Sequence, residues 1–168
     1  MELSEQEKAK LAQQYDKLAG KFNELYLAGK ERGRDAMSVA LEKSHEQMAA
    51  LGEFSAEHGA ELKKYMARDM DQTIADAQHM GEEAKERLNP GRLGAGALAS
   101  LAAVLESTGN ALQSLGEKTK EKLTYKTGEV TSAGTLTCQA CGEAMHFKET
   151  GHIPPCPKCS GTLFNKGY

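Results

Sequence analysis

The stretch CQACGEAMHFKETGHIPPCPKC, residues 138–159, contains all four cysteines of this 168-residue chain, in two C-x2-C pairs that are separated by 14 residues. Each pair can make a tight turn that presents two thiolates from one side. Two such turns at the ends of a short hairpin can close a tetrahedron of sulfurs around an ion, with Zn–S distances of about 2.3 Å. The spacing therefore predicts one metal site formed by Cys138, Cys141, Cys156 and Cys159.

Compartment and coordination chemistry favour a structural metal over disulfides. The start, MELSEQEK, has no basic segment followed by an apolar one, so we expect a cytoplasmic protein whose thiols are kept reduced. Four thiolates leave no open position for a substrate or an activated water, which predicts one structural Zn²⁺. Iron in a rubredoxin-like electron carrier is the alternative metal, and a redox-sensing zinc switch is a further alternative.

The residues around the cysteines predict a small β structure. From Tyr125 onward, Gly, Thr, Val and Pro are frequent, and short alternating runs indicate strands at 134–137 and 144–148. His146 and His152 lie between the two pairs, but four cysteines already complete a ligand set, so we expect strand or surface histidines. We predict a rubredoxin-like, antiparallel-β zinc ribbon over residues 124–168, stabilised by its metal.

The first 123 residues have the apolar periodicity of helices. Ser4 and Glu7 fit a capping box, and Gly52 can end a helix in left-handed geometry. The apolar stripes predict helices at 4–29 or 4–33, 35–51, 55–89 and 94–123, the third ending at Asn89-Pro90-Gly91. The fold class is therefore α+β, with an antiparallel helical hairpin, bundle or coiled-coil region over 1–123 and the ribbon over 124–168.

Charge and motifs exclude several classes of function. Residues 1–123 carry 17 Lys and Arg against 21 Asp and Glu (−4), and residues 124–168 carry 4 against 3 (+1). Neither part has the excess of basic residues that is typical of phosphate binding. The most apolar run, 93–105, is too short to span a membrane. No phosphate-binding loop, dinucleotide fingerprint or nucleophile elbow is present, so no catalytic residue is expected.

The run YKTGEVTSAGTLTCQACG, continuing to CPKCSGTLF, resembles the C-terminal ribbon of an uncharacterised family of small bacterial zinc-ribbon-containing proteins. The segment Gly52-Glu53-Phe54-Ser55 is similar to a cap between two helices of that family. The resemblance implies a helical N-terminal part and four metal-binding cysteines, and it implies no particular reaction. The family's second turn tends to read CPKCG, whereas this chain has Ser160 before Gly161.

A second resemblance is to the short rubredoxin-type tail of rubrerythrins, which hold two irons between Glu and Glu-x-x-His motifs of a helical bundle. Glu42 and His45 match one such motif, and Asp76 and His79 match another with Asp in place of Glu. The match is partial because the two motifs fall on consecutive helices and the fourth helix has no histidine. We expect these four side chains to be solvated.

These observations predict a non-enzymatic adaptor or regulatory protein. Its ribbon is expected to present residues 143–151 and 160–162 to a partner, most readily a protein. Nucleic acid ranks below protein because the ribbon has four lysines, no arginine and a tetrathiolate of formal charge −2. No membrane partner is expected, and the helices are candidates for homo-oligomer contacts.

Overall fold

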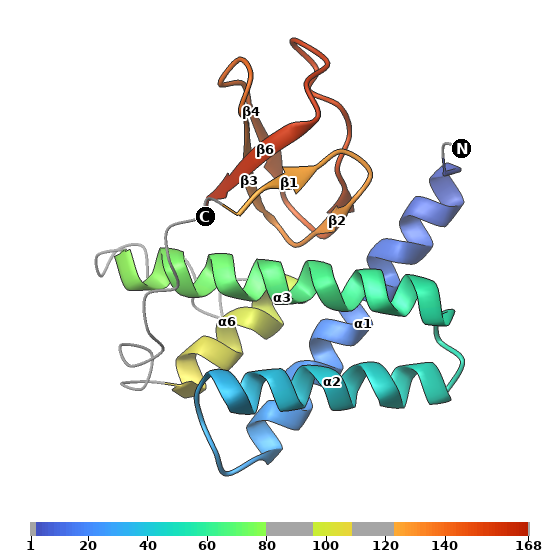
Figure 1. The fold of residues 1–168 in the computed structure, drawn as a ribbon, viewed down its shortest axis with the longest axis vertical. Coiled ribbons are helices and arrows are strands. Elements are labelled where there is room, and N and C mark those ends of the chain that lie inside the picture. The colour runs from blue at the N-terminus through green and yellow to red at the C-terminus, as the bar shows by residue number, and fades with distance from the viewer. Residues whose placement is uncertain (1–2, 80–95, 109–122, 168) are drawn as a thin grey trace.

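The computed structural model describes residues 3–79, 96–108 and 123–167, and in these it confirms the α+β fold. The described helices come first in the chain and the strands follow (Figure 1). The helices are α1 (Glu5–Ala28), α2 (Arg34–Ala50), α3 (Ala56–His79) and α6 (Ala97–Thr108). The strands are β1 (Tyr125–Lys126), β2 (Val130–Thr131), β3 (Gly134–Cys138), β4 (Ala144–Phe147), β5 (Gly151–His152) and β6 (Leu163–Gly167).

Local signals in the sequence set several helix ends. The Ser4 side chain accepts a hydrogen bond from the Glu7 N–H at 3.3 Å, and the Glu7 carboxylate accepts one from the Ser4 N–H at 2.8 Å, which is the expected capping box. Gly52 follows α2 with φ +73°, as predicted. The predicted stop at Asn89-Pro90-Gly91 and the part of the fourth helix beyond Thr108 lie outside the described residues.

Helix α1 is the centre of the helical part and contacts α2, α3 and α6. Its buried stripe includes Tyr15, Leu18 and Phe22, which the apolar periodicity predicted, and also Tyr26, which takes the buried position next to the predicted Leu25. Deep in the bundle, the Tyr26 hydroxyl lies 2.8 Å from the Thr108 hydroxyl of α6. None of the helices in the described ranges has both the length and the apolarity to cross a membrane.

The strands form a four-stranded antiparallel sheet in the order β1-β6-β3-β4 and a two-stranded antiparallel sheet of β2 and β5. In the central pair, Cys138 of β3 is opposite Phe164 of β6, and Leu136 is opposite Lys166. The core between the sheets is small and also contains two cysteine side chains. Its buried members are Tyr125, Leu136, Cys138, Ile153, Cys156 and Phe164.

The ribbon sits directly on the helices (Figure 1), through contacts of β2, β5 and β6 with α1 or α3. The Arg68 guanidinium of α3 lies 3.8 Å from the centre of the buried Tyr125 ring and forms an ion pair with Glu129. On α1, the Asp16 carboxylate accepts hydrogen bonds from the Thr150 hydroxyl at 2.5 Å and from the Ala97 N–H at 2.8 Å. Side chains of the helical part therefore pack against and hydrogen-bond to the face of the ribbon that is turned toward the helices.

A buried polar cluster lies at the centre of this interface, and we call it the Asp69 cluster: Tyr15, Asp69, Thr131, Ser132 and Lys166. The side chains of Asp69 and Lys166 are 0% exposed. One Asp69 oxygen accepts hydrogen bonds from the Tyr15 hydroxyl at 2.6 Å and the Ser132 N–H at 2.8 Å. The Lys166 ammonium donates to the Thr131 hydroxyl, the Ser132 hydroxyl and the Ser132 carbonyl at 2.7–3.0 Å.

The hydrogen bonds and charges around Asp69 keep its carboxyl group ionised. Burial by itself raises the pKa of Asp69, but the cations Lys166 and Arg68, the Ser132 N–H and the Tyr15 hydroxyl together bring that pKa below its usual value. The carboxylate and the Lys166 ammonium are 3.5 Å apart. Removing one partner of such a pair leaves a buried charge without compensation.

We therefore expect Asp69→Asn to destabilise the protein by about 3–5 kcal/mol, because Lys166 would stay buried without its counter-charge. The matched control is Glu53→Gln, which also turns a carboxylate into an amide, in the partly exposed Lys17–Glu53 pair, whose side chains are 59% and 35% exposed. Its cost is expected to be under about 1 kcal/mol. Urea unfolding followed by circular dichroism measures both, and equal costs would contradict a stabilising role for the cluster.

Candidate metal centre

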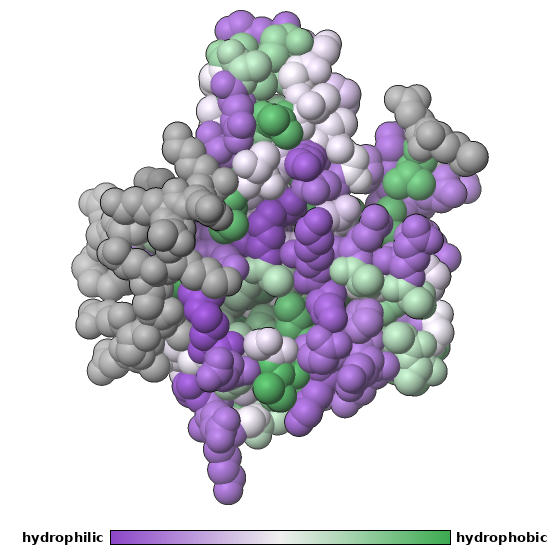
Figure 2. Space-filling view, viewed as in Figure 1, coloured by the Kyte–Doolittle hydropathy of each residue, from purple (hydrophilic) through white to green (hydrophobic). Residues whose placement is uncertain are grey.

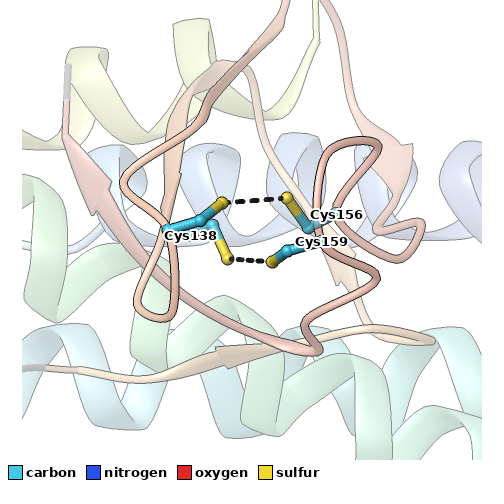
Figure 3. Close-up of side chains that lie close together, drawn as sticks. Cys138, Cys156 and Cys159 are labelled. Carbon is cyan, nitrogen blue, oxygen red and sulfur yellow. Dashed lines mark hydrogen bonds between the residues drawn. The ribbon is translucent and has the colours of Figure 1, made fainter.

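The four cysteine sulfurs converge between two turns of the ribbon, and all four sulfurs lie within 4.8 Å of one another. The closest contacts are 3.6 Å between Cys138 and Cys159 and 3.6 Å between Cys141 and Cys156. Figure 3 shows the sulfurs of Cys138, Cys156 and Cys159 pointing toward the same space. None of the four is in a disulfide. A tetrahedral zinc ion with bonds of about 2.3 Å places its sulfurs about 3.8 Å apart, so the arrangement fits one ion.

The two turns, which we call knuckles, have the same backbone hydrogen bond. In the first knuckle the Gly142 N–H donates to the Cys138 carbonyl at 2.9 Å, and in the second the Ser160 N–H donates to the Cys156 carbonyl at 2.8 Å. Both residues at this position are left-handed, with φ +74° for Gly142 and φ +60° for Ser160. The departure noted in the sequence thus places a serine where the backbone favours glycine.

Gly161 lets the backbone pass close to the sulfurs. A Cβ atom at this position would lie 3.1 Å from the sulfur of Cys138 and 3.1 Å from that of Cys159. The carbonyl of Gly161 also accepts a hydrogen bond from the Cys156 N–H at 2.9 Å. A glycine is therefore favoured here by lack of space, not by its backbone dihedral angles.

The crowded thiols make a cation necessary if all four are to ionise. The pKa of the Cys138 thiol is lowered to about 7, mainly because the backbone N–H of Cys141 points at the Cys138 sulfur. The Gly161 N–H lowers the pKa of Cys159, but the sulfurs of Cys141 and Cys138 and burial together raise it to about 12. Once one thiolate has formed, the next is disfavoured by its charge. A divalent ion bound by all four would compensate these charges and hold the sulfurs as thiolates.

The two histidines of the ribbon lie outside the group of sulfurs. His146 is exposed on β4, and its Nδ1 is 3.0 Å from the Thr135 hydroxyl. His152 is on β5, where it pairs with Val130, and burial lowers the pKa of its ring. Neither joins a group of three or more close metal-ligating side chains; within the described ranges, the four cysteines alone form such a group.

The structure does not bring together the Glu42/His45 and Asp76/His79 pairs. The expectation that these side chains are solvated is wrong for His45, which is 17% exposed because its ring stacks on Phe54 and its Nε2 lies beside Gly59 near the start of α3. Asp76 and His79 are near the other end of that helix. At 1.5 Å per residue, Gly59 and His79 are about 30 Å apart. The two pairs therefore cannot share a di-iron site in this fold.

Comparison with known proteins agrees with the geometry of the site. A family model described as a zinc-ribbon containing domain matches residues 26–167, which include α2, α3, α6 and the described strands as well as the four cysteines. No curated protein and no solved structure matches the chain. The matched range covers the helical part from the end of α1 together with the ribbon.

The left-handed backbone at Ser160 leads to a stability prediction. A residue other than glycine pays about 1–2 kcal/mol to adopt left-handed geometry. Replacing it by glycine recovers only part of this free energy, because glycine loses more conformational entropy on folding. We expect Ser160→Gly to stabilise the metal-loaded protein by about 0.5–1 kcal/mol, and Gly142→Ala at the equivalent position to destabilise it by a similar amount. Thermal unfolding measures both, and a loss of stability in Ser160→Gly would show that the serine side chain contributes to the knuckle.

The lack of space at Gly161 leads to a prediction about metal affinity. Gly161→Ala would push two sulfurs away from their positions by a few tenths of an ångström, so we expect the Kd for zinc to rise about tenfold. Gly167→Ala is the control, because a Cβ there meets no atom within 4 Å. Competition with a chromophoric chelator measures the two values. An unchanged affinity in Gly161→Ala would mean that the sulfurs are not held as tightly as the structure indicates.

Proposed function

The chain belongs to the family of zinc-ribbon containing domains, and from this premise we propose that it is a non-enzymatic, zinc-binding adaptor or regulatory protein. The single observation that carries the proposal is the closed group of four sulfurs, all within 4.8 Å of one another. An ion bound by all four has no position left for a substrate or a reactive water. Its role is then to stabilise the ribbon, and the ribbon's role is to bind a partner.

The knuckles are one part of the ribbon that a partner could reach. They lie at the end of the ribbon remote from the helices (Figure 1), and several of their residues are exposed. We define this knuckle surface as Gln139, Ala140, Lys158, Thr162 and Leu163. The wider loop expected to bind a partner, residues 143–151, is partly used within the chain, because Thr150 bonds to Asp16 and Gly151 pairs in β5.

The character of the knuckle surface supports a protein partner over nucleic acid. Of the ribbon's four lysines, Lys166 is buried in the Asp69 cluster and Lys158 lies 3.6 Å from the Glu143 carboxylate. Few cations are therefore available for phosphate contacts, which dominate nucleic-acid affinity. Leu163 is 42% exposed, and Figure 2 shows pale green and white residues next to a hydrophilic, purple tip at this end of the ribbon. An exposed apolar side chain beside a rigid turn is suited to contact with a protein partner.

Metal analysis of protein that was produced without added iron tests the proposal first. We expect colourless protein with one zinc per chain, and less than one in Cys141→Ser, because a tetrathiolate site loses affinity when one ligand is replaced. Red protein that contains iron and has visible absorbance would instead support an electron carrier of rubredoxin type. Protein that binds neither metal would overturn the proposal.

A pair of leucine variants tests the adaptor role. Leu163→Asp places a charge on the knuckle surface, whereas Leu51→Asp makes the same change at the end of α2, where Leu51 is 77% exposed. We expect both to keep their zinc and only Leu163→Asp to lose most of the partner recovered by affinity purification, as for an apolar contact at the centre of an interface. Equal recovery with both variants would move the binding surface away from the knuckles.

A further inference from the structure

The metal centre and the Asp69 cluster are connected through one pair of strands. Cys138 ends β3 and is opposite Phe164 of β6, while Lys166 lies two residues further along β6, opposite Leu136. Two residues of a strand span about 7 Å. The same two hydrogen-bonded strands therefore carry a cysteine at the knuckle end and the buried lysine at the helix end.

The ribbon has little besides the metal to hold these strands in register. Its core has four large buried side chains, Tyr125, Leu136, Ile153 and Phe164, and the two cysteines Cys138 and Cys156, and the partly buried Leu123, Met145 and Phe147 pack against it. A domain of this size cannot be stabilised by so few apolar residues, which is why small ribbons depend on their ion. Loss of the ion should therefore loosen β3 and β6, and with them the position of Lys166.

Loosening of β6 would withdraw Lys166 from Asp69, and with it the hydrogen bonds by which Lys166 holds Thr131 and Ser132, at the end of β2, beside the carboxylate. The ribbon supplies the Lys166 ammonium, the Ser132 N–H and the Thr131 hydroxyl, whereas the helices supply the Tyr15 hydroxyl. Arg68 of α3 is also close, with its Nε 3.7 Å from the Asp69 carboxylate. A carboxylate that keeps only part of this set is too costly to leave buried, so water must reach it.

We propose that the metal centre controls the docking of the ribbon, so that loss of the ion releases Lys166 from Asp69 and exposes the face of α1 and α3 that the ribbon covers. The inference rests on the proposed function in one respect, which is that the four cysteines hold an ion. It adds a device that couples metal occupancy to the accessibility of a helical surface. Coupling between two sites is reciprocal, so docking through Asp69 must in turn strengthen metal binding.

The reciprocal effect can be measured with Asp69→Asn, a change in α3 that touches none of the cysteines. We expect the Kd for zinc to rise roughly 5- to 150-fold, the usual range of coupling between sites, whereas the control Glu53→Gln leaves it unchanged. Thr131→Val is a milder variant in case Asp69→Asn does not fold, because it removes one hydroxyl and keeps both charges. The Kd of Thr131→Val for zinc should also rise, but by a smaller factor. Unchanged zinc affinity in the folded variants would overturn the inference.

Hydrogen exchange of the wild-type protein gives an independent test without any variant. After chelation, we expect the amides around Tyr15 and Asp69 to exchange about tenfold faster, while those of α2, which lies on the side of the bundle remote from the ribbon (Figure 1), change little. A response confined to the ribbon, or an equal increase in every helix, would overturn the inference. Protein that contains no metal at the start would refute the proposed function instead, so the two failures are distinguishable.

Discussion

The buried carboxylate of Asp69 is the constraint on which the position of the ribbon on the helices depends. It lies on a helix, but the Lys166 ammonium, the Ser132 N–H and the Thr131 hydroxyl come from the ribbon. Since a charge inside a protein must be paired and hydrogen-bonded, the ribbon has one position on the helices in which all of these groups meet. An apolar contact would tolerate sliding, whereas this set of directed bonds does not.

Arg68 of α3 makes a second set of contacts between the helices and the ribbon. Its guanidinium lies over the Tyr125 ring, within the ribbon's core, and pairs with Glu129 on the loop between β1 and β2. The helical part thus supplies a cation to the ribbon, and the ribbon supplies Lys166 to the helices. This exchange of charges lies at one end of the strands, and the four cysteines that can bind a metal lie at the other end.

This arrangement determines which surfaces are available for binding. The edge of the ribbon near Thr150 and Gly151 faces α1, and Asp16 links it to the start of α6. The knuckles point away from the bundle (Figure 1), and several of their residues are exposed. A partner that binds there would read a surface whose shape depends directly on the ion.

The amino-acid sequence by itself was sufficient to predict the features that are formed by residues close together in the chain. The Ser4–Glu7 cap, the turn at Gly52 and the two C-x2-C knuckles are local, and their chemistry can be read from the spacing of the residues. The Asp69–Lys166 pair joins residues 97 positions apart, and in the sequence each is an ordinary charged residue of an amphipathic segment. Only the tertiary structure decided that both are buried, because complementarity between two distant surfaces leaves no periodic signal. For the same reason, His45 matched a metal motif in the sequence but stacks on Phe54 in the fold.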